Sequence, residues 1–274
     1  MMEGQKDLGL KEKAATIRQK VLNLCYSSGS GHVGSSFSVV EILTTLYFST
    51  MNHPDRPRKM DERDRIILSK GHGCPALYAT LCMSGLISEK ILEGFAMDGG
   101  TLEQHPTRNK EYGIDVSSGS LGHGLSIGAG MALAAKSDDK DHRVFVIMSD
   151  GETNEGSTWE AALFAAQNGI DNLVAIIDYN KMQALGKTMD IIGLDPFVPK
   201  WEAMGWEARE VDGHDFSQLI PALEAIPFRP GKPSVIIAHT VKGKGVCFME
   251  NQLLWHYRCP DDKEYQKAIR ELCK

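Results

Sequence analysis

A carboxylate and an amide follow two apolar segments of this chain at a separation that suits metal and phosphate chemistry. Asp150-Gly151 comes just after the apolar run Val144–Met148, and Asn180 closely follows the run Leu173–Ile177. The separation, 180 − 150 = 30 residues, is enough for one helix-containing crossover between two parallel strands. Parallel strands deliver the residues that follow them to the same edge of a sheet. We therefore expect a site of hard oxygen ligands there, suited to Mg²⁺ or Ca²⁺ and a diphosphate.

Three protein ligands are predicted for this metal. Asp150 would supply a carboxylate, Asn180 an amide oxygen and Met182 a backbone carbonyl. Two diphosphate oxygens and a water would complete an octahedron. The residues alone leave an alternative open, because an Asp-Gly pair is common in ordinary turns and an Asn is frequent after a strand.

A glycine cluster, Gly119-Ser120-Leu121-Gly122-His123-Gly124, precedes a helix rich in Ala and Gly. Glycines let a ligand approach the backbone, and a helix N-terminus favours negative charge. A dinucleotide site is disfavoured, because its glycine motif would directly follow the first strand. Close packing of the helix is the alternative explanation for these glycines.

Four histidines lie in predicted loops beside Gly or Pro, namely His32, His72, His105 and His256. Loop histidines are available to hydrogen-bond phosphates and sugar hydroxyls and to transfer protons near pH 7. A single loop histidine is more often a solvated surface residue, so the argument depends on the set. No His/Cys pair has the spacing of a zinc site.

Two further carboxylates, Glu155 and Glu160, follow Asp150 closely. They are either favourable charges in the first turns of a helix over Thr158–Asn168, or a carboxylate pair at a subunit boundary.

Composition argues against several other classes of protein. The chain has 274 residues, 42% hydrophobic and 24% charged, which is enough for a full-sized globular core. Its net charge of −6 and its lack of a long basic run argue against nucleic acid as a partner. Six scattered cysteines without a C-x-x-C pair indicate reduced thiols and a cytoplasmic location. Met1–Arg18 lacks the apolar core of a secretory signal, and no stretch approaches the ~20 apolar residues of a membrane span.

Alternating strand and helix patterns predict an α/β fold, with a parallel sheet covered by helices on both faces. We expect a single domain over residues 1–274, with a surface extension from about residue 242. The predicted loop Asp98–Val116 is long enough to be functional. The predicted strands are Arg65–Leu68, Val144–Met148, Leu173–Asp178, Glu207–Val211 and Ser234–His239, and the predicted helices are Leu10–Tyr26, Val39–Phe48, Ala76–Met83, Ser88–Phe95, Gly119–Lys136, Thr158–Asn168 and Phe216–Ile226.

Taken together, these segments resemble the N-terminal, diphosphate-binding part of transketolase, in order and over nearly the whole chain. The resemblance implies the thiamine-diphosphate-binding PP-domain fold. The matching blocks are Ser30-Gly31-His32, Gly71-His72-Gly73, Gly119-Ser120-Leu121-Gly122-His123-Gly124, Asp150-Gly151 with Glu155-Gly156, Asp178-Tyr179-Asn180 and Lys242-Gly243-Lys244-Gly245-Val246.

The resemblance also implies roles for single residues. Asp150, Asn180 and the Met182 carbonyl match the family's metal ligands, with Mg²⁺ or Ca²⁺ as the ion. His32 and His105 match histidines that meet donor and acceptor hydroxyls. Glu155 and Glu160 match acids that link paired cofactor sites across an interface. The catalytic candidates are His32, His72, His105, His256 and Glu155. The expected contacts of thiamine diphosphate are His72, Gly119, Ser120, Leu121, Gly151, Glu152, Asn180 and His256.

The main departure from the family is length. Members carry a second domain that binds the aminopyrimidine and supplies the glutamate that activates the cofactor. The chain therefore resembles one subunit of a split transketolase, whose C-terminal subunit is a separate polypeptide in an α₂β₂ assembly acting on small sugars or sugar phosphates. Ser149 and Tyr179 also depart from the usual residues at their positions.

Two alternatives to this function remain. One is a component of another thiamine-diphosphate enzyme, similar to 1-deoxyxylulose-5-phosphate synthase or a 2-oxo-acid dehydrogenase. The other is a non-catalytic cofactor-binding subunit. The set of His32, His72 and His105 favours transketolase, because ketose and aldose hydroxyls need several neutral hydrogen-bonding groups.

Overall fold

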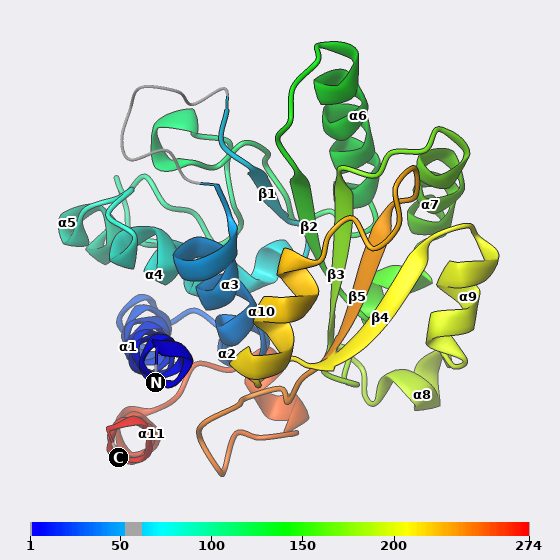
Figure 1. The fold of residues 1–274 in the computed structure, drawn as a ribbon. Helices are drawn as coiled ribbons and strands as arrows, with labels where there is room; N and C mark the ends of the chain where they lie inside the picture. Colours follow the sequence, from blue (N-terminus) through cyan, green and yellow to red (C-terminus); the bar gives the residue numbers. More distant parts are fainter. Residues whose placement is uncertain (1, 53–61, 274) are drawn as a thin grey trace.

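A five-stranded parallel sheet forms the centre of the molecule (Figure 1). The computed structural model describes residues 2–52 and 62–273, so residues 1, 53–61 and 274 of the predicted single-domain span lie outside the described residues. The strand order is β1-β2-β3-β5-β4. All five predicted strands are confirmed to within one residue at each end: β1 Arg65–Leu68, β2 Val144–Ser149, β3 Leu173–Tyr179, β4 Glu207–Asp212 and β5 Ser234–His239.

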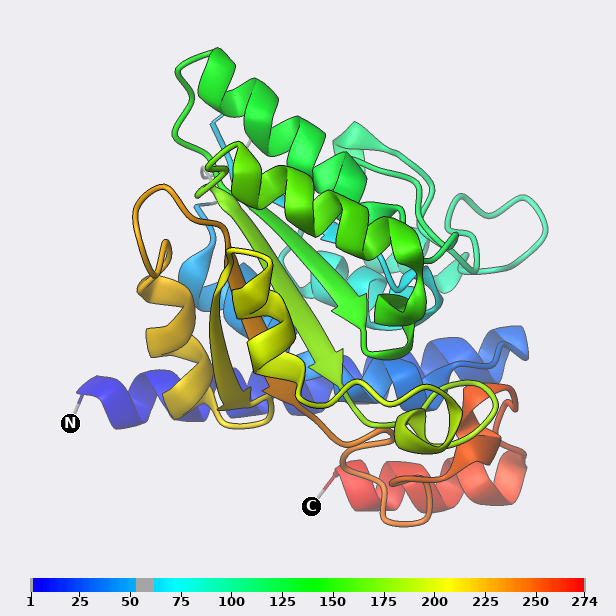
Figure 2. The same ribbon diagram turned by 90° about the vertical axis from the view of Figure 1, so that its right-hand side faces the viewer.

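Helices cover both faces of the sheet, which confirms the predicted α/β class (Figures 1 and 2). Strands β2 and β3 are buried along their whole length, because both of their faces meet a helical layer. Phe145 and Ile176 belong to the core beneath α1, α3 and α10, whereas Val146 and Ile177 belong to the core beneath α6, α7 and α9. Strand β4 lies at the edge of the sheet and is the most exposed strand.

Most of the predicted helices are present. The α-helices are α1 Met2–Ser28, α2 Val33–Ser38, α3 Val40–Thr45, α4 Cys74–Met83, α5 Glu89–Glu93, α6 Gly124–Ser137, α7 Gly156–Gln167, α8 Thr188–Ile191, α9 Phe197–Ala203, α10 Phe216–Glu224 and α11 Asp262–Leu272. Four of them are not predicted by the sequence, namely the short helices α2, α8 and α9 and the C-terminal helix α11. The residues 98–116 form a loop with one short turn at Lys110–Tyr112. No helix among the described residues is long and apolar enough to cross a bilayer.

The segment from Lys242 onward is more than the surface extension that the sequence predicts. Lys242, Val246, Met249 and Trp255 are all buried. The turn Leu253–His256 packs against α2. Helix α11 then runs alongside α1 (Figure 2). The first part of this segment therefore belongs to the interior, and only α11, which has an amphipathic sequence, is a surface element.

Candidate active site

A cavity of about 330 Å³ lies at the carboxyl ends of the central strands. Strands β2 and β3 are paired in register, with Ser149 beside Asp178, so the segments after them reach the same edge as predicted. The cavity is lined by His32, Ser35, His72, His105, Leu121, Ser149, Asp150, Gly151, Asn154, Glu155, Asn180, Met182, Gln183, Ala184, Ile191, Ile192 and His256.

Asp150 is almost fully buried at the end of β2. Its Oδ2 accepts a hydrogen bond from the Thr188 hydroxyl at 2.7 Å, and its Oδ1 accepts one from the Gly151 amide at 3.0 Å. Burial raises the pKa of Asp150 to about 6, and the neighbouring Asp178 adds to this shift. A carboxylate whose charge is disfavoured by burial in this way is suited to bind a cation.

A second buried carboxylate, Asp178 at the end of β3, is already neutralised. It forms a fully buried ion pair with Lys70 and accepts hydrogen bonds from the hydroxyls of Ser38 and Thr240. Burial alone would raise the pKa of Asp178, but Lys70 and the hydroxyl donors outweigh it and hold the pKa below its ordinary value. Lys70 also donates to the Ser35 carbonyl at 2.9 Å, which fixes the start of α2 against the strand ends.

The other two predicted metal ligands lie in the turn after β3. The Asn180 side-chain oxygen accepts a hydrogen bond from the Met182 amide at 3.1 Å, which folds this turn back on itself. The Met182 carbonyl accepts from the Lys242 ammonium at 3.4 Å. Asp150, Asn180 and Met182 all line the cavity, so the structure brings the three candidates together.

Three of the predicted histidines form one cluster. The ring centroids of His32, His72 and His256 lie 5.1 to 5.6 Å apart. Burial, followed by His105 and the nearby lysines, lowers the pKa of His32 to about 4. Burial and Lys242 lower the pKa of His256 to about 3, and burial and Lys70 lower that of His72 well below its ordinary value. His105 is exposed and lies on the cavity wall from the long loop.

Lys242 is a residue of this site for which the sequence motifs predict no role. Its side chain is buried, and its ammonium lies 2.6 Å from Nδ1 of His256. Burial and the nearby Lys70 lower the pKa of Lys242 to about 8. The sequence does contain a signal for Lys242, because it is a lysine at the start of a glycine-rich turn shortly after the last strand. An anion bound at the edge of the sheet would meet a residue in that place.

The glycine loop is held tightly between neighbouring segments. A Cβ built on Gly71 would lie 2.8 Å from the Gly119 amide nitrogen, and Gly119 itself has a φ of 136°. Leu121 reaches the cavity, but Gly119 and Ser120 are not among its lining residues. Ser120 is exposed and lines a separate hollow near α6.

The three predicted glutamates have different surroundings. The Glu152 carboxylate is buried away from the cavity, where it accepts hydrogen bonds from the Ser69 hydroxyl and the Gly122 amide. It holds the glycine loop against β1 and does not face the cavity. Glu155 lines the cavity and is exposed, whereas Glu160 is exposed on α7 and does not line it.

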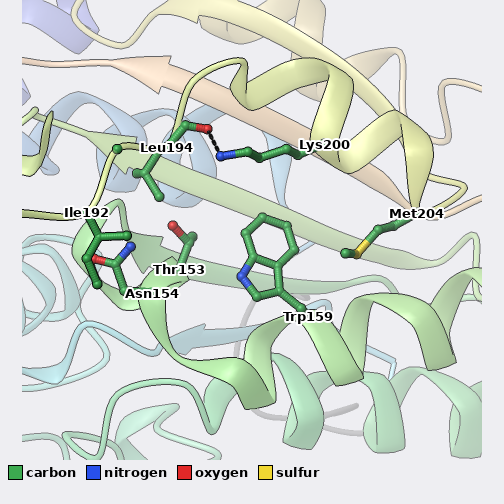
Figure 3. A pocket seen from close by; sticks show the side chains of 8 residues that line it. Thr153, Asn154, Trp159, Ile192, Leu194, Lys200 and Met204 are labelled. Carbon is green, nitrogen blue, oxygen red and sulfur yellow. Dashed lines mark hydrogen bonds between the residues drawn. The ribbon is translucent and has the colours of Figure 1, made fainter.

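A shallower hollow of about 280 Å³ adjoins the cavity and shares Asn154 and Ile192 with it (Figure 3). Trp159 and Met204 line its apolar floor. Lys200 lies on its wall and donates to the Leu194 carbonyl at 2.5 Å.

The cavity has the donors and acceptors that a metal-bound diphosphate requires. Asp150, Asn180 and Met182 present oxygens, while Lys242 brings an ammonium close to them. Within the described part of the chain, the buried Nδ1 of His32 has no hydrogen-bond partner. An anionic ligand with polar groups therefore fits this site, although the chain as a whole is acidic.

Comparisons with known proteins all point to transketolases. The family described as "Transketolase, thiamine diphosphate binding domain" matches residues 10–271. The chain is 41% identical to one of the subunits of the apulose-4-phosphate transketolase of Phocaeicola vulgatus, over 93% of this chain and 90% of that one. It is 40% identical to the 6-deoxy-6-sulfo-D-fructose transketolase subunit SqwG of Clostridium sp., over 98% of both.

Solved structures show the same fold. The transketolase from Leishmania mexicana superposes with a TM-score of 0.89 at 27% identity, covering 97% of this chain. This chain spans 41% of that longer enzyme. The match over residues 10–271, with the identities above, shows that the chain belongs to the transketolase thiamine-diphosphate-binding domain family.

Proposed function

We propose that this protein is the N-terminal subunit of a split transketolase, and that it transfers two-carbon ketol units from a ketose to an aldose together with a separate C-terminal subunit. The observation that carries this proposal is one cavity at the strand ends, lined by three candidate oxygen ligands and four histidines. Two relatives that it matches over 90% and 98% of their length are themselves named as transketolase subunits.

Thiamine diphosphate with Mg²⁺ or Ca²⁺ is the cofactor that we infer for this cavity. Asp150, Asn180 and the Met182 carbonyl would hold the metal, and His72, His256, Lys242 and the Gly151 amide would hold the diphosphate. When bound, the cofactor supplies the nucleophilic carbon and the electron sink for ketol transfer. The protein binds and orients the reacting groups and exchanges protons with them.

The histidines are suited to bind sugar hydroxyls. Because burial keeps the pKa values of His32, His72 and His256 below their ordinary values, these rings are neutral at physiological pH and can both donate and accept hydrogen bonds. His32, directly before α2, and His105, on the long loop, both line the cavity, and we assign them to the substrate hydroxyls.

The surroundings of the cavity favour a second polypeptide. Leu185, Met189 and Ile192 are exposed on and beside α8, next to the lining residues Ala184 and Ile191, where a protein surface would bury them. Ile127 is exposed on α6, and Phe164 is exposed on α7 one turn from Glu160. We infer that the first surface binds the C-terminal subunit, whereas the second binds another copy of this chain, in a cytoplasmic α₂β₂ assembly.

We further infer that the chain is one domain. The buried residues Val246, Met249 and Trp255 of the C-terminal segment belong to the same core as Leu22 and Phe37 near the N-terminus. The segment after β5 is then part of the cofactor site, through Lys242 and His256.

Reconstitution with the C-terminal subunit tests this function. The purified chain alone should bind thiamine diphosphate weakly and show no ketol transfer, and adding the C-terminal subunit should restore both. A panel of ketose donors and aldose acceptors would identify the sugars. Ketol transfer by this chain in a preparation free of partner would refute the split arrangement, and cofactor binding without any transfer by the complex would indicate a non-catalytic subunit.

A further inference from the structure

The loop that carries His105 has a specific anchor that the proposed mechanism does not use. Residues 103–105 have no regular secondary structure, and His105 itself is exposed. A histidine on such a segment would sample many positions unless its backbone were fixed from another element. The backbone is fixed by α4, the helix that begins directly after the turn of His72.

Two buried side chains of α4 bind three successive carbonyls of this segment. The Tyr78 hydroxyl is shared between the carbonyls of Glu103, at 3.1 Å, and His105, at 3.2 Å. The Cys74 thiol lies 3.0 Å from the carbonyl of Gln104. Tyr78 is 1% exposed, and burial raises its pKa far above its ordinary value, so its phenol remains a donor at any working pH.

The imidazole of His105 is confined from another side by the glycine loop. A Cβ built on Gly119 would lie 2.7 Å from Cδ2 of His105, so the ring lies directly against the Gly119 backbone. The next residue, Pro106, accepts a hydrogen bond from the Ser118 amide at 3.0 Å. Helix α4 thus fixes the backbone of His105, and it directly follows the turn that carries His72.

We propose that Tyr78 is a positioning residue, which sets the orientation of His105 in the cavity by holding the carbonyls of Glu103 and His105. The proposal rests on the proposed function, in which His105 meets substrate hydroxyls. It concerns turnover rather than cofactor affinity, because Tyr78 is not among the residues that line the cavity.

The test is Tyr78→Phe, which removes one oxygen and keeps the ring. In the isolated full-length chain, the Cε1–H proton resonance of His105, identified with His105→Gln, should shift or broaden. In the complex with the C-terminal subunit, kcat should fall roughly tenfold, as loss of one neutral hydrogen bond implies. The affinity for thiamine diphosphate with Mg²⁺ should stay within about twofold, and Tyr78→Phe should have no further effect on kcat in the His105→Gln background.

Two other variants separate positioning from general stability. Tyr265→Phe removes a phenol that donates to Asn23 at 2.8 Å on the outer helices, and it should leave the His105 resonance and kcat unchanged. Cys74→Ala removes the thiol at the Gln104 carbonyl and should move the same resonance.

The outcomes distinguish this proposal from the proposed function. An unchanged His105 resonance in both Tyr78→Phe and Cys74→Ala, with wild-type kcat, would overturn the positioning role. Full additivity of Tyr78→Phe and His105→Gln would also overturn it. If the resonance moves but His105→Gln leaves kcat unchanged, positioning stands and the assigned role of His105 in turnover fails.

Discussion

Replacing Glu41 by Gln should reveal how strongly a buried ionic network supports the cofactor site. Glu41 on α3 pairs with Arg18 of α1 at 2.6 Å and with Nδ1 of His214 at 2.9 Å. Nε2 of His214 accepts a hydrogen bond from the amide of Val241 at 2.8 Å. The network therefore reaches the residue that precedes Lys242, so its loss should affect both folding and cofactor affinity.

The magnitude follows from the pKa of Glu41. Burial alone would raise it, but Arg18 and His214 lower it from an ordinary 4.5 to about 2. The difference, 4.5 − 2 = 2.5, corresponds to about 3 kcal/mol of folding stability at pH 7, at about 1.4 kcal/mol for each pKa unit. Because the folded pKa is depressed, this stability is present above pH 4.5 and is lost as the pH falls toward 2. By the same linkage, about 2 kcal/mol of this contribution to folding stability would remain at pH 3.5.

Urea unfolding of the wild type and of Glu41→Gln, followed by tryptophan fluorescence at pH 7 and pH 3.5, measures this difference. The variant should be less stable by about 3–5 kcal/mol at pH 7, since Arg18 is left buried without its partner. The difference in unfolding free energy between wild type and variant should narrow by about 1 kcal/mol at pH 3.5. The control is Glu89→Gln, which removes a far more exposed pair with Lys20 and should cost well under 1 kcal/mol. A gap that is the same at both pH values would refute the reasoning.

Three further predictions concern the site and its scaffold. Asp150→Asn should abolish Mg²⁺-dependent binding of thiamine diphosphate in calorimetry with the C-terminal subunit present, and unchanged affinity would exclude Asp150 as a ligand. His32→Asn should lower turnover by about 10²–10⁴-fold with near-normal cofactor affinity, and normal turnover would contradict the role of His32 at the substrate hydroxyls. Asn is chosen because it tolerates the positive φ of 66° that His32 has. Gly128→Ala should destabilise the fold by about 1–3 kcal/mol in thermal or urea unfolding, because its Cβ would lie 2.5 Å from Val146, whereas Gly130→Ala on the same helix meets nothing within 4 Å and should be neutral or stabilising.

The strands could be predicted because burial on both faces leaves a strong signal. The six residues of β2 are all buried, and the first five, Val144–Met148, form an apolar run bounded by polar residues. The short helices α8 and α9 give no such signal, because four and seven residues are too few for a helical period to show. The sequence predicts a surface extension for the residues Lys242–Trp255 because their buried side chains are spaced irregularly between glycines and polar residues.

Site residues could be predicted where a motif reports a backbone position, but not where tertiary packing decides. Asp150 and Asn180 follow strands, so their proximity follows from the sheet. Glu152, two residues after Asp150, is predicted at the cofactor, yet it turns inward because Ser69 and the Gly122 amide provide it with buried donors. No sequence pattern reveals that Tyr78 holds the segment of His105, since 27 residues separate them.

The contrast between Asp150 and Asp178 separates function from structure at this sheet edge. Both follow neighbouring central strands and both are buried. Asp178 has Lys70 and two hydroxyl donors, and its pKa is lowered, so its charge stabilises the fold. Asp150 has no ion-pair partner among the described residues, and burial raises its pKa from 3.8 to about 6. Its charge therefore destabilises the cofactor-free chain as the pH rises through this range, by up to about 3 kcal/mol at pH 7.

A divalent cation would remove that cost, since it supplies the positive charge that Asp178 already receives from Lys70. Asp150→Asn should accordingly raise the stability of the cofactor-free chain at pH 7 while it removes metal binding. A structural carboxylate would show the opposite result on stability. Two carboxylates whose surroundings shift their pKa values in opposite directions thus have different tasks, and the uncompensated one is the residue that we assign to the metal.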